Sequence, residues 1–215
     1  KLVIVDVALG ETSIQLASQL NTEELQFASV GGATPNCTDL NAILSTISDQ
    51  PIQDESPGAL MMYTSGTTGY PKGVIRPLPD ASQVATPAFA ADLITLFGMG
   101  GNEVRYLSTQ PLYHAAALRF ALAVTAGGGY VRIMPRFHAE KALTLLESDQ
   151  ITHSQWVPVM FQRLMGLPEN LRKAFHAPKH RCAIHGAAPC SVSLKQDMIE
   201  WWGPIFLEYY SGSEG

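Results

Sequence analysis

Short apolar or β-branched runs alternate with stretches of helical periodicity along most of this chain. The first such step pairs the run at residues 2–5 with apolar side chains at helical spacing after Gly10. Further strands are expected at residues 27–30, 59–63, 104–108, 130–134, 182–184 and 205–209, and helices at residues 39–47, 82–97, 115–126, 138–147, 158–165 and from 191 onward. This alternation is typical of right-handed β-α-β units, so we expect an α/β fold with a mainly parallel sheet flanked by helices. Ligands of such sheets bind beyond the carboxyl ends of the strands.

The polar stretch at residues 48–57 is typical of a loop, but no segment is distinct enough to divide the chain into two domains. Near the start of the last expected helix, Ser193 and Gln196 stand at the spacing of a capping box. With 46% hydrophobic and 15% charged residues, the 215-residue chain has enough apolar side chains to form a substantial core.

The charge balance narrows the choice of partners. Fourteen Lys and Arg against 19 Asp and Glu give a net charge of −5, which disfavours a nucleic-acid partner and favours small molecules. The longest apolar stretch, residues 115–131, is interrupted by Arg119 and by three consecutive glycines, so we expect no membrane-spanning segment. The N-terminal residues also lack the long apolar core of a signal peptide.

The three cysteines bear on the cellular compartment. They form no C-x-x-C pair, which disfavours a disulfide scaffold, and we therefore expect a reducing, cytoplasmic location. A structural zinc ion is an alternative that the spacing disfavours. Its ligand-type side chains would be His180, Cys182, His185 and Cys190.

The segment from Tyr63 to Gly73 is the strongest functional signal in the sequence. It reads Tyr-Thr-Ser-Gly-Thr-Thr-Gly-Tyr-Pro-Lys-Gly and follows an apolar run. Hydroxyl and backbone N–H groups in such a loop can surround phosphate oxygens, and Lys72 adds a positive charge. A Walker A loop is excluded, because Pro71 stands where glycine is needed and Gly73 where a hydroxyl is needed. The alternatives are a flexible turn and a solvated lysine, which eleven consecutive residues of this composition disfavour.

Residues 64–73 resemble the signature loop of the adenylate-forming enzymes, [ST]-S-G-[ST]-T-G-x-P-K-G, at every defined position. That family includes acyl-CoA synthetases, 4-coumarate:CoA ligase, luciferase and the adenylation domains of peptide synthetases. Its loop holds the β- and γ-phosphates of ATP. The resemblance therefore implies that ATP is bound by Thr64, Ser65, Gly66, Thr67, Thr68, Gly69 and Lys72.

Three further segments resemble the family in the correct order. Residues 111–114 resemble its P-L-[FY]-H segment, whose histidine lies beside the acyl pocket, and residues 185–189 resemble the turn that lines adenine and substrate. Residues 208–215 resemble its Y-G-x-T-E segment, whose hydroxyl meets the α-phosphate and whose glutamate binds Mg²⁺. The implied nucleotide-binding residues are Gly186, Ala187, Ala188, Glu208, Tyr209, Tyr210 and Ser213, the implied catalytic residues are Lys72, His114, Ser213 and Glu214, and the implied Mg²⁺ ligand is Glu214.

Two residues depart from the last of these motifs, because Ser211 and Ser213 replace the usual glycine and threonine. Serine keeps the hydroxyl group, but Ser211 adds a side chain where backbone is expected to approach closely. Taken singly, His114 could be a hydrogen-bonded residue at a helix start, residues 186–189 an ordinary turn and Glu214 a surface acid. The order of the motifs favours the site instead.

The resemblance implies a reaction in which a carboxylic acid and MgATP give an acyl-adenylate and pyrophosphate, followed by transfer to the thiol of coenzyme A. Positioning two anions and neutralising their charge requires no side-chain nucleophile. We expect a small fatty or aryl acid as substrate, while the oligomeric state is left open. The alternatives are a carrier-protein or other acceptor, and a nucleotide-binding module without catalysis.

The resemblance also implies a longer enzyme. Members of the family carry a longer N-terminal region, a ribose-binding aspartate and a mobile C-terminal domain with an essential lysine. We therefore expect residues 1–215 to be an AMP-binding domain fragment that is weakly active or inactive alone.

Overall fold

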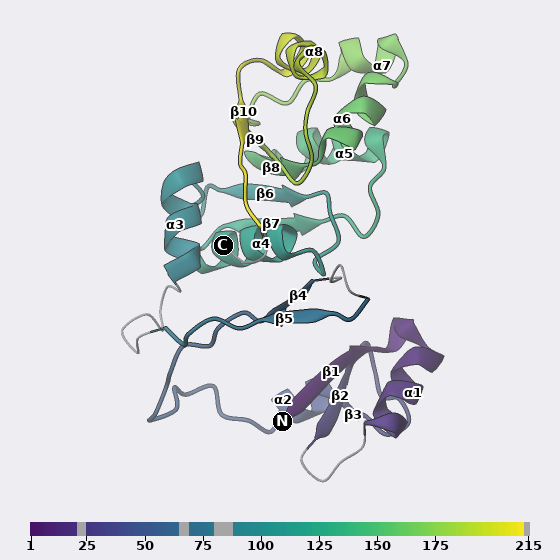
Figure 1. Cartoon of the computed structure of the whole chain (residues 1–215), viewed down its shortest axis with the longest axis vertical. Coiled ribbons are helices and arrows are strands. Elements are labelled where there is room, and N and C mark those ends of the chain that lie inside the picture. The colour runs from purple at the N-terminus through teal and green to yellow at the C-terminus, as the bar shows by residue number, and fades with distance from the viewer. Residues whose placement is uncertain (21–24, 65–68, 80–87, 213–215) are drawn as a thin grey trace. The chain divides into compact units, whose positions relative to one another are not determined.

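The computed structural model describes residues 1–20, 25–64, 69–79 and 88–212 (Figure 1). The chain forms two compact units, Lys1–Asp54 and Glu55–Gly215. Their boundary falls inside the loop expected at residues 48–57, where residues 48–56 are all exposed. This exposed polar stretch therefore connects the two compact units. Each unit is therefore described by itself.

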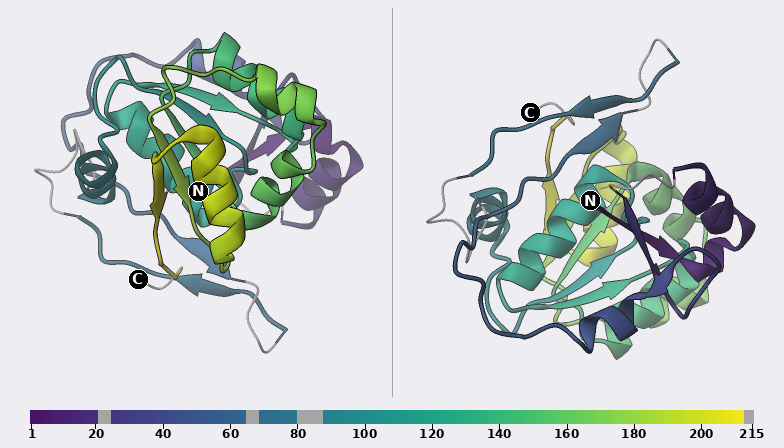
Figure 2. Two further views of the ribbon diagram at one scale, coloured as in Figure 1. Left: turned by 90° about the horizontal axis from the view of Figure 1, so that it is seen from above. Right: turned by 90° about the horizontal axis from the view of Figure 1, so that it is seen from below.

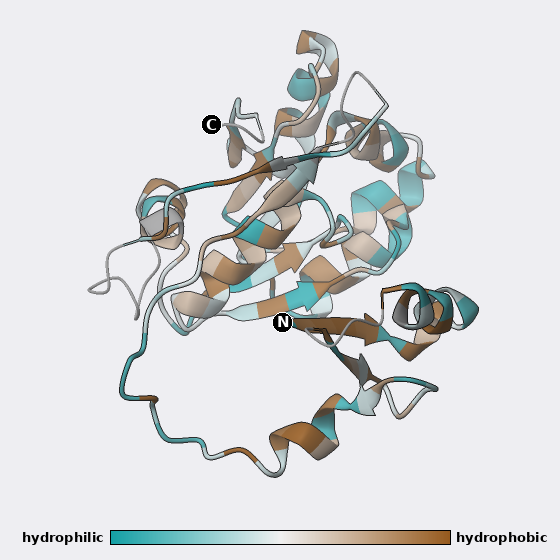
Figure 3. Ribbon diagram, turned by 60° about the horizontal axis from the view of Figure 1, so that its bottom comes forward, coloured by the Kyte–Doolittle hydropathy of each residue, from teal (hydrophilic) through white to brown (hydrophobic). Residues whose placement is uncertain are grey.

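The first unit is a small parallel sheet in the order β1-β2-β3 with helices beside it. Its strands are β1 (Leu2–Asp6), β2 (Gln26–Val30) and β3 (Thr38–Asp39), and its helices are η1 (Val7–Leu9), α1 (Glu11–Gln19) and α2 (Leu40–Leu44). The β-branched run of β1 is coloured as apolar in Figure 3. Val5 and Phe27 are buried, whereas Leu2 and Ile4 are about half exposed, so one face of this sheet is better covered than the other.

The second unit begins with a hairpin of β4 (Met62–Thr64) and β5 (Lys72–Val74). The sequence predicts a strand at residues 59–63 belonging to the parallel sheet, but the strand begins at Met62 and pairs in antiparallel fashion, with Tyr63 opposite Gly73. The strands on either side of the glycine-rich segment, β4 and β5, therefore pair with each other and not with the parallel sheet. Gly73 lies against the side chain of Met61, which leaves no space for a Cβ atom.

The core of the second unit is a five-stranded parallel sheet in the order β10-β9-β8-β6-β7. The strands are β6 (Arg105–Ser108), β7 (Tyr130–Ile133), β8 (His153–Trp156), β9 (Cys182–His185) and β10 (Phe206–Glu208). The chain leaves β6 toward β7 on one side and continues from β8 toward β9 on the other. The direction of winding therefore reverses between β6 and β8, where ligands of such sheets bind.

Helices cover both faces of this sheet (Figure 2). They are α3 (Ala88–Phe97), α4 (Ala115–Ala126), α5 (Ala139–Ser148), α6 (Pro158–Met165), α7 (Glu169–Ala174) and α8 (Val192–Trp202). One apolar cluster joins the sheet to α5, α6 and α8, and includes Trp156 and Phe161. A second cluster joins it to α3 and α4, and includes Tyr106 and Phe120. No helix in the described part of the chain has the length and apolarity needed to cross a membrane.

The start of α8 agrees with the helix expected from residue 191, but its cap differs from the expected one. Its N-cap is Ser191, whose hydroxyl accepts a hydrogen bond from the backbone N–H of Leu194 at 3.3 Å. The predicted capping box of Ser193 and Gln196 was wrong, because both residues lie inside the helix. The hydroxyl of Ser191, two residues before Ser193, already accepts a hydrogen bond from a backbone N–H of the first turn.

Candidate functional site

The carboxyl ends of β6, β8, β9 and β10 meet at one edge of the parallel sheet, here called the carboxyl edge. Glu208 pairs with His185, and Gln155 pairs with both Ser108 and Ile184. The residues that follow β9 and β10, Gly186 and Tyr209, are therefore neighbours on this edge. Both belong to segments that the sequence assigns to a nucleotide site.

Gly186 and Tyr209 are packed closely together. A Cβ atom on Gly186 would lie 2.7 Å from Cε1 of Tyr209 and 2.8 Å from the carbonyl oxygen of Tyr209. The next residue, Ala187, has a φ of 67°, in the left-handed region that side chains disfavour. Gly186 is buried, whereas Ala187 and Ala188 are exposed and form a tight turn at the surface. The ring of Tyr209 thus explains why only glycine fits at position 186.

Glu208 is the residue before Tyr209, and its side chain is bound to α8. Its carboxylate accepts a hydrogen bond from the ammonium group of Lys195, which lowers the pKa of Glu208. The other carboxylate oxygen lies 3.9 Å from Nδ1 of His185. The next aromatic residue along the chain, Tyr210, is fully exposed. Among residues 208–210, Tyr210 therefore has the most exposed side chain.

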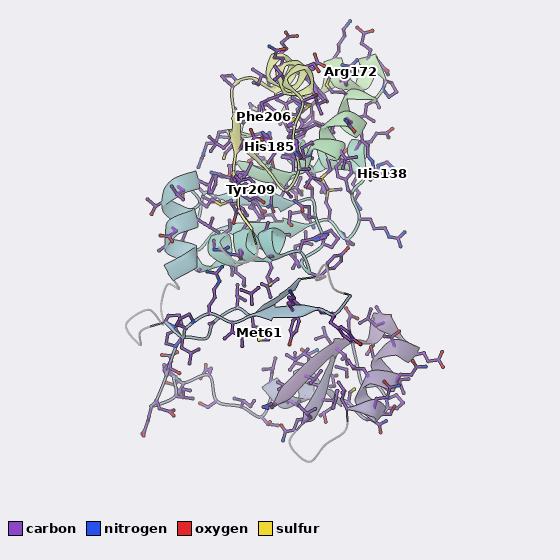
Figure 4. All side chains as sticks on the ribbon, viewed as in Figure 1. Met61, His138, Arg172, His185, Phe206 and Tyr209 are labelled. Atoms are coloured by element: carbon purple, nitrogen blue, oxygen red, sulfur yellow. The ribbon has the colours of Figure 1, made fainter. Side chains whose placement is uncertain are left out.

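His185 lies at the end of β9, on the face of the sheet opposite Tyr209 (Figure 4). Its imidazole is completely buried, and its ring centroid is 5.5 Å from that of Phe161. Neither ring nitrogen has a hydrogen-bond partner among the described residues. Burial lowers the pKa of His185, and the charge of Lys195 lowers it further, so the ring is neutral near pH 7.

His114 is the N-cap residue of α4, and its side chain makes no capping hydrogen bond. The ring is exposed and lies 4.4 Å from the ring of Tyr113, measured between centroids. The described contacts therefore neither bury His114 nor hydrogen-bond its side chain.

Lys72 opens β5, and its side chain is exposed. Thr64 ends β4, and Gly69 has a φ of 87°. Among the described residues, no hydrogen bond or ion pair joins Lys72 to the carboxyl edge of the parallel sheet. Six of the predicted site residues lie outside the described residues: Ser65, Gly66, Thr67, Thr68, Ser213 and Glu214.

Two residues at the carboxyl edge were missed by the sequence analysis. The hydroxyl of Tyr106 donates a hydrogen bond to Oε1 of Gln155 at 3.0 Å, and Nε2 of Gln155 donates one to the hydroxyl of Tyr209 at 3.1 Å. Tyr106 and Gln155 are buried. No apolar pattern marks residues 151–156, so no local signal in the sequence indicates that Gln155 is buried and requires hydrogen-bond partners.

Three of the four residues considered for zinc, His180, Cys182 and His185, are buried. Nε2 of His180 lies 2.6 Å from the hydroxyl of Ser154, and burial lowers the pKa of His180 to about 3. Burial also raises the pKa of the Cys182 thiol to about 11. In the part of the chain that the structure describes, no three His, Cys, Asp or Glu residues form a group able to hold a metal ion.

Comparison with known proteins gives consistent results for the whole chain. A family model described as AMP-binding enzyme matches residues 2–215. The medium/long-chain-fatty-acid–CoA ligase FadD8 of Mycobacterium tuberculosis is 30% identical over 180 residues, which are 82% of this chain and 30% of that protein. The 2-succinylbenzoate–CoA ligase of Staphylococcus aureus is 31% identical over 156 residues, which are 70% of this chain and 28% of that protein. The chain thus spans less than a third of these relatives.

Solved structures support the same fold. The amide bond synthetase McbA from Marinactinospora thermotolerans superimposes with a TM-score of 0.75 at 21% identity, covering 98% of this chain and 39% of that one. The N-terminal domain of FACL13 from Mycobacterium tuberculosis gives a TM-score of 0.74 at 22% identity, covering 100% of this chain and 51% of that one. The sheet and helices described above are therefore part of the large N-terminal domain of the adenylate-forming fold.

Proposed function

The chain belongs to the AMP-binding enzyme family, and from this premise we propose that it takes part in the ATP-dependent activation of a carboxylic acid, followed by thioester formation with coenzyme A. The observation that carries the proposal is the family match over residues 2–215, together with relatives named as CoA ligases. The turn of Ala187 and Ala188 beside Gly186 and Tyr209, at the carboxyl edge, supports it independently.

In the proposed first step, a carboxylate oxygen of the acid attacks the α-phosphorus of ATP. The bond between the α-phosphorus and the bridging oxygen of the β-phosphate breaks, and its electron pair leaves with pyrophosphate. In the second step the thiol of coenzyme A gives up its proton to solvent and its sulfur attacks the acyl carbon. The bond between the acyl carbon and the phosphate oxygen breaks, and its electron pair leaves with AMP. Both steps join groups that carry negative charge or develop it, so catalysis consists mainly of positioning and charge neutralisation.

The residues of this chain divide that work between two segments. We assign Thr64, Gly69 and Lys72 of the β4–β5 hairpin, with residues 65–68 between the strands, to the β- and γ-phosphates. Lys72 is exposed and supplies a positive charge in a protein of net charge −5. We assign the turn of residues 186–188 and the segment 208–213 to the adenine and the α-phosphate. His114, exposed at the start of α4, is proposed to lie beside the acid.

Mg²⁺ would accompany ATP and screen phosphate charge in this reaction. We propose Glu214 as its ligand and the cytoplasm as the compartment. No step above depends on the metal. The acid is proposed to be fatty or aryl, because one relative is named for medium- and long-chain fatty acids and another for 2-succinylbenzoate.

A second acceptor class has a specific observation in its favour. A solved structure that superimposes with a TM-score of 0.75 is described as an amide bond synthetase. An amine acceptor, or a carrier-protein thiol, would use the same first step and differ only in the second. A nucleotide-binding module without catalysis would bind ATP and perform neither step.

The test is carboxylate-dependent exchange of labelled pyrophosphate into ATP, measured on the natural full-length polypeptide that carries this chain. A panel of octanoate, palmitate, benzoate and 2-succinylbenzoate covers both proposed acid classes. We expect exchange with at least one of them, and formation of a CoA thioester when coenzyme A is added. Binding of ATP without exchange across the panel would refute acid activation and support the non-catalytic module.

Lys72→Met provides a residue-specific check of the same proposal. Loss of a charge that contacts phosphate should lower exchange about tenfold or more. Lys173→Met is the matched control, because Lys173 is an exposed lysine on α7 whose partner is Glu169 at 2.7 Å. An equal loss in both variants would contradict a phosphate-binding role for Lys72.

A further inference from the structure

Three side chains form a hydrogen-bonded chain across the parallel sheet, here called the relay. The hydroxyl of Tyr106 on β6 donates to Oε1 of Gln155 on β8 at 3.0 Å. Nε2 of Gln155 then donates to the hydroxyl oxygen of Tyr209, the residue after β10, at 3.1 Å. The relay meets the carboxyl edge beside the point between β6 and β8 where the winding of the sheet reverses.

The chemistry of the amide gives the relay a direction. A glutamine side chain has one oxygen that accepts and one NH₂ group that donates. Because the hydroxyl of Tyr106 occupies the oxygen, the NH₂ group faces Tyr209. Tyr106 is completely buried, which raises its pKa well above the ordinary value, so its hydroxyl keeps the hydrogen that it donates to Gln155. Leaving one of these buried polar groups without its hydrogen-bond partner would destabilise the protein.

The relay ends on a donor. Tyr209 accepts a hydrogen bond from Gln155, so its own hydroxyl hydrogen points elsewhere. Among the described residues, Gln155 is the one hydrogen-bond partner of the Tyr209 side chain. Burial raises the pKa of Tyr209, so the hydroxyl is protonated near pH 7. An O–H donor is thus presented at the carboxyl edge.

The ring that carries this donor is held in place. Its centroid lies 5.6 Å from that of Phe120, and its edge lies against Gly186, where a Cβ atom would be 2.7 Å from Cε1. The backbone N–H of Tyr209 donates to the carbonyl oxygen of His185 at 3.0 Å. Figure 4 shows Tyr209 and His185 on the neighbouring ends of β10 and β9. The direction of the hydroxyl is therefore fixed by packing as well as by Gln155.

Resting on the proposed function, we propose that Tyr106 and Gln155 are positioning residues that aim the hydroxyl of Tyr209 at an anionic oxygen of the bound reactants. That oxygen belongs either to a phosphate of ATP or to the carboxylate of the acid. Both accept a charge-assisted hydrogen bond from a neutral hydroxyl. Among the described residues, the relay ends on a donor that is directed away from Gln155 and is therefore available to a ligand.

The test compares four variants of the full-length polypeptide: Tyr209→Phe, Gln155→Leu, Tyr106→Phe and Tyr130→Phe. Tyr130→Phe is the matched control. Tyr130 lies on β7, the edge strand opposite β10, and its hydroxyl donates a hydrogen bond to Asp149 at 3.3 Å. Dissociation constants for ATP, octanoate and benzoate are measured by calorimetry, and KM and kcat by pyrophosphate exchange. A melting curve for each variant reports whether it is folded.

Tyr209→Phe is expected to weaken one class of ligand about tenfold or more, the effect of losing a hydrogen bond to a charged group. Weakening confined to ATP assigns the phosphate, and weakening confined to the acids assigns the carboxylate. Tyr106→Phe should reproduce much of this loss although Tyr106 is buried, because the amide can then reverse and turn the hydrogen of Tyr209 inward. The pair Tyr106→Phe and Tyr209→Phe should be strongly non-additive.

The relay proposal is overturned if folded Tyr209→Phe binds ATP and both acids as the parent does, or if Tyr130→Phe loses as much affinity. It is also overturned if Tyr106→Phe is folded and binds ATP and both acids as the unsubstituted protein does. This result can be obtained even if Gln155→Leu does not fold. Exchange activity in the parent with an unchanged Tyr209→Phe would refute the relay and leave the proposed function standing. If the unsubstituted protein binds ATP, loses that affinity in Tyr209→Phe and shows no exchange, the relay stands and the proposed function is refuted. Failure of the parent to bind any of the three ligands overturns both.

Discussion

At the carboxyl edge, two adjacent pairs of residues face opposite sides of the sheet and differ in how their polar groups are hydrogen-bonded. Gly186 and Tyr209 lie toward α4, where Tyr209 is hydrogen-bonded to Gln155 and packed on Phe120. His185 and Glu208, one position earlier on each strand, lie toward α8. Among the described residues, the buried imidazole of His185 has no hydrogen-bond partner, and a carboxylate oxygen of Glu208 lies 3.9 Å from its Nδ1.

The difference shows where polar groups at this edge are paired and where they are not. On the α4 face, the relay pairs the buried Tyr106 and Gln155 and leaves one donor, the hydroxyl of Tyr209. On the α8 face, a completely buried His185 keeps two unpaired ring nitrogens, an arrangement that costs stability. The buried polar groups of the α4 face are therefore better paired than those of the α8 face, as expected if the relay positions a donor for a ligand.

Acid should produce the largest effect, and it should act on the buried histidines rather than on the relay. Burial lowers the pKa of His180 to about 3 and that of His153 to about 4. In the unfolded chain these imidazoles take up protons below about pH 6.5, whereas in the folded chain they do not. The free energy of unfolding should therefore be constant above pH 6.5 and fall toward pH 4, by up to about 1.4 kcal/mol per pH unit for each histidine.

Urea unfolding at half-unit steps from pH 8 to 4 measures this slope. His180→Gln should reduce it, because one of the buried histidines with a lowered pKa is gone, while His153 and His185 remain. The pKa values of Tyr106 and Tyr209 are raised, so the relay does not titrate in this range. A free energy of unfolding that does not change between pH 6.5 and 4 would contradict the assignment.

Gly186→Ala adds a side chain on the α4 face and should have the next largest effect on the free energy of unfolding. The added Cβ would meet both the ring and the backbone oxygen of Tyr209, so the strand ends must move apart. We expect a loss of roughly 2 kcal/mol or more in the free energy of unfolding. Gly58→Ala is the control, since a Cβ there meets nothing within 4 Å. Equal stability of the two variants would show that Tyr209 does not lie across Gly186.

Replacing buried histidines by leucine distinguishes a paired imidazole from an unpaired one. His185→Leu removes two unpaired nitrogens and should leave stability unchanged or increase it. His153→Leu removes a ring whose Nδ1 lies 2.7 Å from the hydroxyl of Thr152, and should cost roughly 1 to 3 kcal/mol near pH 7. Urea denaturation of both variants gives the comparison. A larger loss for His185→Leu would mean that this imidazole has a partner in solution.

Lys195→Met should have the smallest effect on stability. The carboxylate of Glu208 is 47% exposed, and an ion pair of this kind contributes within about 1 kcal/mol. Because the charge of Lys195 lowers the pKa of His185, the substitution should raise that pKa. An NMR titration of the imidazole measures the shift. A pKa of His185 that falls or stays constant would show that Lys195 does not act on this ring.

Much of the fold was predictable from local patterns in the sequence. The helices expected at residues 115–126 and 158–165 have those bounds in the structure. Strand β8 was left unassigned, because its sequence His-Ser-Gln-Trp is polar while all four residues are buried. Strand β5 was missed because it owes its pairing to a hairpin rather than to apolar residues.

The site was predictable only where its residues form contiguous motifs. The sequence brought Gly186 and Tyr209 into one predicted site, and the structure places them in contact. Tyr106 and Gln155 belong to no motif, and their partnership depends on strand order, which local periodicity does not encode. The same limit applies to Glu208, whose ion pair with Lys195 depends on how α8 packs on the sheet.

The relay also has a consequence for how the protein folds. Its two hydrogen bonds join residues that are 49 and 54 positions apart in the chain. Contacts between such distant residues require the closure of long loops and form late. Tyr209 can reach Gln155 only after β8, β9 and β10 have paired, so we expect a refolding chain to acquire ligand affinity after most of its helical signal has returned. Stopped-flow refolding followed by circular dichroism and by ATP binding would measure that delay.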